Sequence, residues 1–252
     1  DEARLVPVEV SDPLACPRYA GVALTNVKVG PSPAWLQERL KSIGLKPINN
    51  VVDITNYVQH ELGQPLHAFD ADRLTGGRIL VRRAAEGELF VTLDGKERKL
   101  AATDLVIADA ERPVCIAGVF GGAESGVSES TTSVFMESAC FDAPTVRRTA
   151  RRHGLNTDAS FRFERGVDPE KTVYALKRAA LLLKEVAGAH ISSAIVDIHP
   201  APRSWCKVLL SFAQVDSLIG TSLPKEEVLG VLSALDCRIV RSDAIGVEVE
   251  VP

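Results

Sequence analysis

The chain has 252 residues, of which 46% are hydrophobic and 25% are charged, as in an ordinary globular protein. Its formal net charge of −4 excludes a global attraction to nucleic acid, so any such binding must come from a local basic patch. The five cysteines are far apart and form no CxxC or Cys/His cluster. This pattern argues against structural zinc and indicates reduced thiols in a cytoplasmic protein.

No run of apolar residues reaches the ~20 that a membrane-spanning helix needs, so we expect no membrane association. The length allows one large domain, or one domain with a smaller one. We assign residues 1–18, which contain three prolines, to an incoming linker, 19–200 to the main domain and 203–252 to a partial second unit after a Pro-Ala-Pro segment. The start at Asp1 and the end at Pro252 lead us to expect part of a longer polypeptide.

In chain order, residues 19–29 show partial apolar alternation and predict a strand. Two helices are predicted next, over 35–43 and 51–62, and each is followed by a glycine that ends it. In the second helix Thr55 and Asn56 are adjacent. One of these two side chains can therefore face away from the core toward a pocket.

The segment GQPLHAFD places His67 beside apolar residues, where residue type alone favours a packed histidine over a catalyst. From Gly77 the pattern changes to short apolar strands, with a type I′ hairpin turn at Asp94-Gly95. Residues 120–127 form a glycine-rich loop that matches neither of the usual phosphate-binding patterns. We interpret its paired glycines as allowing the backbone to approach a ligand or another strand closely.

Residues 133–141 predict a further strand, with Phe135, Glu137 and Ala139 on one face. A carboxylate on an otherwise apolar face is costly to bury unless it has a partner. Glu137 therefore either points to solvent at the edge of a sheet or lines a pocket.

A helix capped by Asp142 is predicted over 143–153, and it begins the one dense basic patch of the chain. This patch fits either contact with a phosphate backbone or a solvated face that is paired with local acids. Its members are Arg147, Arg148, Arg151, Arg152, His153, Arg162 and Arg165.

Residues 151–169, RRHGLNTDASFRFERGVDP, are too charged and irregular for a simple connector. Two phenylalanines alternate with charged residues, as in a short strand, while Asp158 and Arg162 have the spacing of a helical pair, so both conformations remain open. Asp168 then predicts the N-cap of a long helix that ends at Gly188. A polar loop anchored by aromatic residues is either a well-capped connection or a place where a site is built.

Three collinear segments, RYAGVALTNVKVGPSPAWLQERLKSIGLKPINNVVDITNYVQHELGQPLHAFD, VFGGAESGV and RRHGLNTDASFRFERGVDP, resemble the bacterial phenylalanyl-tRNA synthetase β subunits. The resemblance covers the B3/B4 module of this family, about residues 12–200, and then enters the B5 module. It implies an α+β fold of layered mixed and antiparallel sheets with helices packed outside, followed by a small partial α+β unit. It also implies post-transfer editing, in which tyrosine wrongly esterified to tRNA(Phe) is hydrolysed.

Carried over position by position, the resemblance implies two catalytic residues and a substrate pocket in which a carboxylate reads the tyrosine hydroxyl. The catalytic residues are His67 and Thr157, and the pocket residues are Glu137, Asn56, Thr55, Gly121 and Ala159. No Ser or Cys lies near a His in a recognised motif, so we expect water to attack the ester, positioned by His67. Phenylalanine would leave a buried Glu137 unpaired, at a cost of about 1–3 kcal/mol or more.

The resemblance further implies tRNA(Phe) and an α subunit, in an α2β2 assembly, as partners. Arg148, Arg151 and Arg152 are the candidates for tRNA contact. The synthetic site lies on the α subunit, so the whole enzyme is expected to use ATP and Mg²⁺ while this fragment holds no cofactor or metal. The alternative function is a non-catalytic module that docks tRNA or a subunit. Convergence of His67, Glu137 and Thr157 on one cavity of amino-acid size would favour editing over docking.

Overall fold

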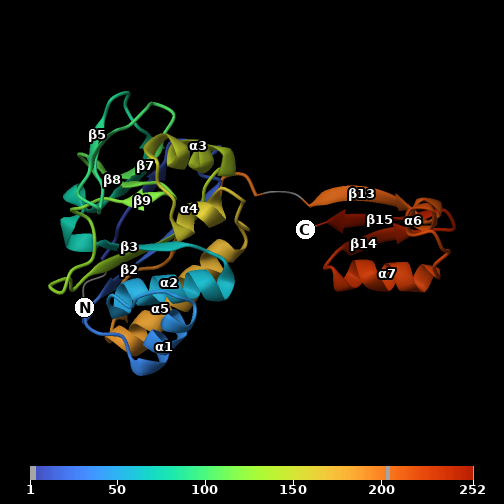
Figure 1. Ribbon diagram of the computed structural model, residues 1–252, viewed down its shortest axis with the longest axis horizontal. Helices are drawn as coiled ribbons and strands as arrows, with labels where there is room; N and C mark the ends of the chain where they lie inside the picture. Colours follow the sequence, from blue (N-terminus) through green and yellow to red (C-terminus); the bar gives the residue numbers. More distant parts are fainter. Residues whose placement is uncertain (1–3, 203–204, 252) are drawn as a thin grey trace. The chain divides into compact units, whose positions relative to one another are not determined.

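The computed structural model describes residues 4–202 and 205–251 and divides the chain into two compact units, Asp1–Ala201 and Pro202–Pro252. Each unit combines helices with mixed or antiparallel sheets, which confirms the predicted α+β class (Figure 1). Within the described ranges, no helix has both the length and the apolar character that crossing a membrane requires.

The first unit is built on a central sheet with the strand order β11-β2-β10-β3, in which β12 also pairs with β2. Every residue of β10 is buried, because both faces of this sheet are covered. The strands are β2 (Arg18–Thr25), β3 (Leu66–Asp70), β10 (Val134–Cys140), β11 (His190–Ile191) and β12 (Val196–Ile198).

Three helices cover one face of the central sheet (Figure 1): α1 (Ala34–Ser42), α2 (Asn50–Leu62) and α5 (Lys171–Ala187).

The ends of these helices follow capping chemistry. The side chain of Asn49 accepts hydrogen bonds from two N–H groups of the first turn of α2, and Gly63 ends that helix in a left-handed conformation. The predicted N-cap of α5 was wrong: its N-cap is Glu170, and Asp168 instead accepts a hydrogen bond from the backbone N–H of Glu170.

A second sheet, in the order β1-β4-β7-β8-β9, shares one hydrophobic core with the opposite face of the central sheet. Its strands are β1 (Val8–Val10), β4 (Ile79–Arg83), β7 (Leu105–Ala108), β8 (Pro113–Ile116) and β9 (Phe120–Gly121). Part of the expected linker at 1–18 is therefore β1, which pairs in parallel with β4. Pro7 and Pro13 flank this short edge strand rather than interrupt it, so they do not prevent pairing.

Two short 3₁₀ turns, η1 (Ala71–Arg73) and η2 (Thr75–Gly77), connect β3 to β4. The predicted hairpin is present as β5 (Leu89–Val91) and β6 (Glu97–Lys99), but its turn is not of type I′. That type needs positive φ at both central residues, whereas here Gly95 has a φ of +77° and Asp94 is not among the residues with positive φ.

The described part of the first unit is completed by α3 (Ala143–His153) and α4 (Asp158–Phe163), which lie near the second sheet (Figure 1). Asp142 caps α3 as predicted, since its side chain accepts a hydrogen bond from the N–H of Thr145. The ambiguous 151–169 segment forms a helix rather than a strand at its centre. A reciprocal capping box between Thr157 and Ser160 starts this helix and decides its conformation.

The second unit follows the predicted order of strand, two helices and hairpin. Its elements are β13 (Cys206–Ser211), α6 (Phe212–Ile219), α7 (Lys225–Ala234), β14 (Arg238–Ser242) and β15 (Gly246–Val251). β15 is the middle strand of its three-stranded sheet and buries Val247 and Val249.

Candidate functional site

A cavity lies on the face of the central sheet that meets the second sheet. In the register of β10 and β3, Glu137 is directly opposite His67, so the two side chains project from the same face. The β8–β9 segment and α4 provide the other walls. The lining residues are Pro65, Leu66, His67, Cys115, Gly118, Val119, Phe120, Gly121, Glu137, Ala159 and Phe163.

The structure thus brings four of the seven residues assigned to the site from the sequence, His67, Glu137, Gly121 and Ala159, to one cavity. It does not place Thr157, Thr55 or Asn56 among the lining residues, so the convergence of three residues expected of an editing site is met only by His67 and Glu137.

Glu137 is 5% exposed, which excludes the alternative in which it points to solvent at a sheet edge. Its Oε2 atom accepts a hydrogen bond of 2.9 Å from the hydroxyl of Tyr19. Burial raises the pKa of the Glu137 carboxyl to about 8, although the hydrogen bond from Tyr19 acts in the opposite direction. The carboxyl is therefore mostly neutral at pH 7.

His67 is half-buried as a residue, but its Nε2 atom is buried and has no hydrogen-bond partner within the described residues. Its ring packs edge-on against Phe69, with the centroids 4.4 Å apart. Burial lowers the pKa of the imidazole to about 4. A neutral imidazole with a free buried nitrogen can hold a water molecule or a polar ligand atom, but it is a weak proton acceptor at neutral pH.

Gly121 lets β9 pass close to the imidazole. A Cβ atom added there would lie 3.0 Å from Cε1 of His67 and 3.0 Å from Cδ1 of Leu93, which belongs to the turn between β5 and β6. A side chain at this position would press on both neighbours. The close approach predicted for the paired glycines is confirmed at Gly122, where an added Cβ atom would lie 2.7 Å from the carbonyl oxygen of Val114 in β8. At Gly121 the close neighbours are instead a histidine ring and a leucine.

Thr157 supports the cavity from outside. Its Oγ1 atom accepts a hydrogen bond from the N–H of Ser160 and donates one of 3.1 Å to the carbonyl oxygen of Val119. The hydroxyl therefore joins the start of α4 to the wall formed by Val119, while Ala159 and Phe163 of the same helix line the cavity.

Thr55 and Asn56 belong to α2, which packs on the opposite face of the central sheet. The hydroxyl of Thr55 donates to the carbonyl oxygen of Val52 within that helix. Tyr19 was missed from the sequence, although a tyrosine within an apolar strand usually indicates a buried hydroxyl that needs a polar partner.

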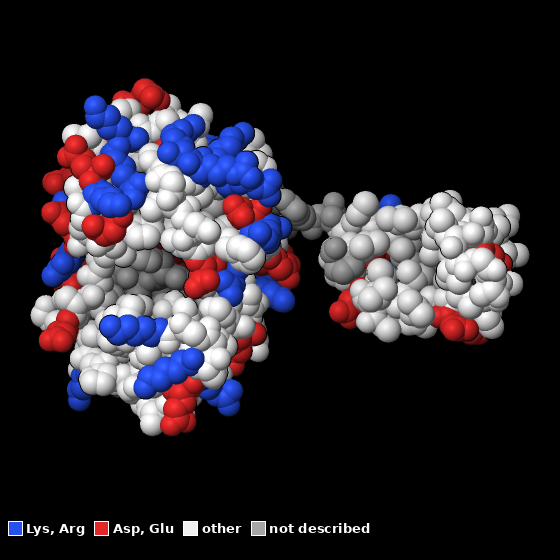
Figure 2. Space-filling model, in the orientation of Figure 1, with Lys and Arg blue, Asp and Glu red and all other residues white. Residues whose placement is uncertain are grey.

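Arginine and lysine side chains gather on the surface over α3 (Figure 2). Arg148 and Arg151 are exposed and have no ion pair within the described residues. Arg152 instead pairs with the buried carboxylate of Asp104, which also bonds His153 at 2.9 Å. Of the seven residues of the predicted basic patch, Arg148 and Arg151 have no ion pair among the described residues, whereas Arg152 is committed to a buried carboxylate. Arg162 and Arg165 pair with the local acids Asp158 and Glu164, as the alternative of a solvated, paired face predicts.

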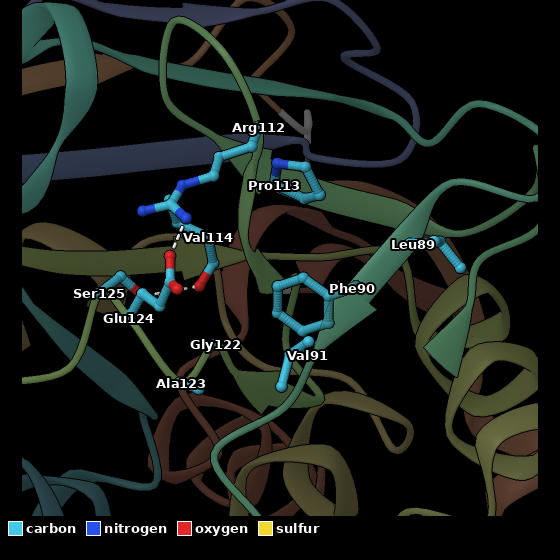
Figure 3. A pocket seen from close by; sticks show the side chains of 10 residues that line it. All are labelled: Leu89, Phe90, Val91, Arg112, Pro113, Val114, Gly122, Ala123, Glu124 and Ser125. Atoms are coloured by element: carbon cyan, nitrogen blue, oxygen red, sulfur yellow. Dashed lines mark hydrogen bonds and ion pairs between the residues drawn. The ribbon is translucent and has the colours of Figure 1, made fainter. Parts of the chain in front are cut away.

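A second hollow, behind β9, is less suited to chemistry (Figure 3). Phe90 lies at its side, the Arg112–Glu124 ion pair crosses its rim, and the hydroxyl of Ser125 donates to the carbonyl oxygen of Val114 at 2.8 Å. Every charged or hydroxyl side chain there already has a partner in the protein. Within the described residues, no group of three His, Cys, Asp or Glu side chains could hold a metal ion.

The B3/4 domain family matches residues 15–188. The chain is 54% identical over 247 residues to the phenylalanine–tRNA ligase β subunit of Bacteroides fragilis (strain YCH46) and 53% identical over 248 residues to that of Porphyromonas gingivalis (strain ATCC BAA-308 / W83). Each alignment covers 98% of this chain and 30% of the relative, so the chain spans less than a third of the length of these relatives.

Among solved structures, the chain is similar to an N-terminal fragment of the phenylalanyl-tRNA synthetase β subunit from Pyrococcus horikoshii, with a TM-score of 0.52. The superposition covers all of this chain and 70% of that one at 14% identity, which shows a shared fold. The chain therefore belongs to the B3/4 domain family, and its resemblance to phenylalanyl-tRNA synthetase β subunits is confirmed.

Proposed function

We propose that this chain carries the editing site of a phenylalanyl-tRNA synthetase β subunit and hydrolyses tyrosine wrongly esterified to tRNA(Phe). The observation that carries the proposal is the cross-strand pair of His67 and Glu137 at the base of one cavity. A buried carboxyl and a buried, unpartnered imidazole nitrogen beside an opening are costly to maintain unless a ligand uses them.

Selectivity follows from the carboxyl. Tyr19 occupies Oε2, so the hydroxyl of a bound tyrosine has Oε1 as its partner. A bound phenylalanine would then leave only Oε1 of Glu137 without a partner, because Oε2 still accepts from Tyr19. The expected penalty lies within the range of about 1–3 kcal/mol for an unsatisfied buried polar group, which is about five- to 150-fold in rate.

The hydrolytic step needs a positioned water molecule. Nε2 of His67 is available to hold that water, and a pKa of about 4 means that the ring does so in its neutral form. The Cys115 thiol also lines the cavity, but burial raises its pKa well above the usual value, which argues against a thiolate nucleophile. Direct attack by water on the ester remains the mechanism that these residues support.

The experiment compares the deacylation of Tyr-tRNA(Phe) and Phe-tRNA(Phe) by the full-length β subunit assembled with its α subunit. Glu137→Ala should lower the preference for Tyr-tRNA(Phe) by about tenfold or more. Glu129→Ala, at an exposed loop position, is the control and should keep that preference. An unchanged preference in Glu137→Ala would overturn the proposal.

We further propose that the acceptor end of tRNA(Phe) approaches over α3, because Arg148 and Arg151 are free to meet phosphates there. This surface is also what a docking module without catalysis would need, and it is the basis for that second candidate function. In the whole cytoplasmic enzyme, the α subunit would carry the synthetic site with its ATP and Mg²⁺, outside this chain.

A further inference from the structure

Tyr19 lies beside the cavity without lining it. In the register of β2 and β10, Tyr19 pairs with Ala139 and Gly21 pairs with Glu137, so Tyr19 and Glu137 are diagonal neighbours on the same face. The side chain of Tyr19 is 0% exposed. Its hydroxyl makes the only hydrogen bond to the Glu137 carboxyl that the described residues provide.

On the side of the Glu137 carboxyl that faces β2, the described residues provide no hydrogen bond other than that from Tyr19. Gly21, directly opposite Glu137, has no side chain, and a Cβ atom there would lie 2.1 Å from the ring of Phe135. The Phe135 ring therefore fills the space above β2.

Four titratable groups surround Glu137. Tyr19 faces it from β2 and His67 from β3, while the thiols of Cys115, in β8, and Cys16, ahead of β2, lie near enough to interact electrostatically. Burial raises the pKa of both thiols well above the usual value, and the imidazole is neutral above about pH 4 because burial lowers its pKa. None of these groups supplies a positive charge at neutral pH, so the hydroxyl of Tyr19 is the one group that stabilises an ionised carboxylate.

We propose that Tyr19 is the positioning residue of the site: it holds Oε2 of Glu137 and commits Oε1 to the substrate hydroxyl. This inference rests on the proposed editing function. It adds that, once Glu137 is ionised, recognition of tyrosine depends on two hydroxyl groups that donate to the two oxygens of one carboxylate, one from the protein and one from the substrate.

A pH dependence follows. An ionised carboxylate left without its second donor is penalised more than a neutral carboxyl, so the preference for Tyr-tRNA(Phe) over Phe-tRNA(Phe) should rise as Glu137 ionises near pH 8. The hydrogen bond from Tyr19 lowers the pKa of Glu137 against the effect of burial. Removing the Tyr19 hydroxyl must therefore raise the pKa of Glu137, so the preference for Tyr-tRNA(Phe) should increase only at a higher pH.

The test measures kcat/KM for both aminoacyl-tRNAs between about pH 6.5 and 9, corrected for spontaneous hydrolysis, with the full-length β subunit assembled with its α subunit. At pH 8, Tyr19→Phe should lower the preference for Tyr-tRNA(Phe) by about tenfold. The pH at which this preference increases should also be higher than in the wild type. Tyr57→Phe is the matched control, because the hydroxyl of Tyr57 also donates to a glutamate, Glu61, but at the surface of α2. In a Glu137→Gln background, Tyr19→Phe should cause no further loss of preference.

The outcomes separate the two proposals. If Glu137→Gln abolishes the preference but Tyr19→Phe leaves both its size and its pH dependence unchanged, the positioning role is overturned and editing stands. If Glu137→Ala leaves the preference unchanged, the proposed function itself fails. If Tyr19→Phe does not fold, 3-fluorotyrosine at position 19 keeps the hydroxyl as a stronger donor, and the rise must then move to lower pH. If the preference increases at the same pH as in the wild type, the inference is overturned.

Discussion

His67 on β3 and Glu137 on β10 face each other, but their pKa values are shifted in the directions that prevent an ion pair. Burial lowers the pKa of the imidazole to about 4 and raises that of the carboxyl to about 8, so both groups are mostly uncharged between these values. The base of the cavity is therefore polar but neutral at pH 7. It can accept the aromatic side chain of an amino acid without first desolvating a full charge.

The first prediction concerns stability. In the unfolded chain Glu137 ionises near its ordinary pKa of 4.5, whereas in the folded protein it stays protonated up to about 8. The folded state therefore binds more protons in this window, and stability falls as pH rises from about 4.5 to 8. Glu137→Gln removes this cost and should stabilise the protein at pH 7 by roughly 2–3 kcal/mol.

Urea unfolding of the first unit at pH 4 and pH 7 would measure this gain. The difference between wild type and Glu137→Gln should nearly vanish at pH 4, where both unfolded chains carry an uncharged side chain at this position. Glu129→Gln, on the exposed loop, should show no such pH-dependent difference. A gain that is equal at the two pH values would contradict burial as its cause.

Local sequence chemistry was sufficient to predict much of the fold. Asp142 caps its helix and Gly63 ends α2 as expected, because such helix ends depend only on neighbours within a few residues. The start of α5 was predicted incorrectly because Asp168 accepts a hydrogen bond from Glu170 ahead of the helix rather than capping it. The turn at Asp94-Gly95 was predicted incorrectly because the connection between β5 and β6 is longer than a two-residue hairpin loop. Strand order and register depend on long-range packing, which a single sequence does not display.

The candidate site was harder to predict from the sequence than the fold. Residue type left Glu137 undecided and favoured a packed histidine at position 67, because the register that places the two side chains opposite each other is not visible in the sequence. The resemblance supplied both, and it also supplied Thr157, which the structure places behind the wall of the cavity. Tyr19 was in neither set because its role appears only when β2 and β10 are paired.

The second prediction concerns the protonation of His67. Because burial lowers the pKa of the imidazole to about 4, deacylation of Tyr-tRNA(Phe) should show no inflexion near pH 6.5, the ordinary histidine value. A loss due to protonation of His67 should begin only as the pH approaches about 4 from above. Initial rates between about pH 5 and 7 test this, with His67→Gln as the control. An inflexion near 6.5 that disappears in His67→Gln would contradict it.

The third prediction concerns the space around Gly121. In Gly121→Ala, the new methyl group meets the ring of His67 and the side chain of Leu93 at 3.0 Å, so both must shift by a few tenths of an ångström. The fold should survive, because φ at Gly121 is not in the positive range, but deacylation of Tyr-tRNA(Phe) should fall by about tenfold. Gly30→Ala, with nothing within 4 Å of its Cβ, should match wild type. Full activity in Gly121→Ala would show that the imidazole position is not critical.

The fourth prediction separates support from catalysis at Thr157. Thr157→Ala removes the cap of α4 and the bond to the carbonyl oxygen of Val119, and should destabilise the first unit by about 1 kcal/mol or more. Thr157→Ser keeps both bonds and should be close to wild type. Deacylation of Tyr- and Phe-tRNA(Phe) should fall together in Thr157→Ala, with their ratio unchanged. A changed ratio without loss of stability would instead place Thr157 in contact with the substrate.

The fifth prediction concerns the basic surface over α3. Arg148→Ala and Arg151→Ala should each weaken binding of tRNA(Phe) and lower the slope of log affinity against log salt by about one, because each arginine neutralises one phosphate. Stability should not change, since neither side chain has an ion pair within the described residues. Arg39→Ala, at an exposed position of α1, is the control and should leave the slope unchanged.

Arg152→Ala should behave differently, although it lies on the same helix. Its guanidinium pairs with Asp104, whose side chain is fully buried, so its loss leaves that carboxylate with one counter-charge fewer. The variant should lose stability, and its tRNA affinity should keep the wild-type salt slope. Binding titrations at several salt concentrations, together with thermal unfolding, distinguish the two classes of arginine. If all three variants keep the wild-type slope, the tRNA does not cross α3, and the acceptor end must reach the cavity by another face of the unit.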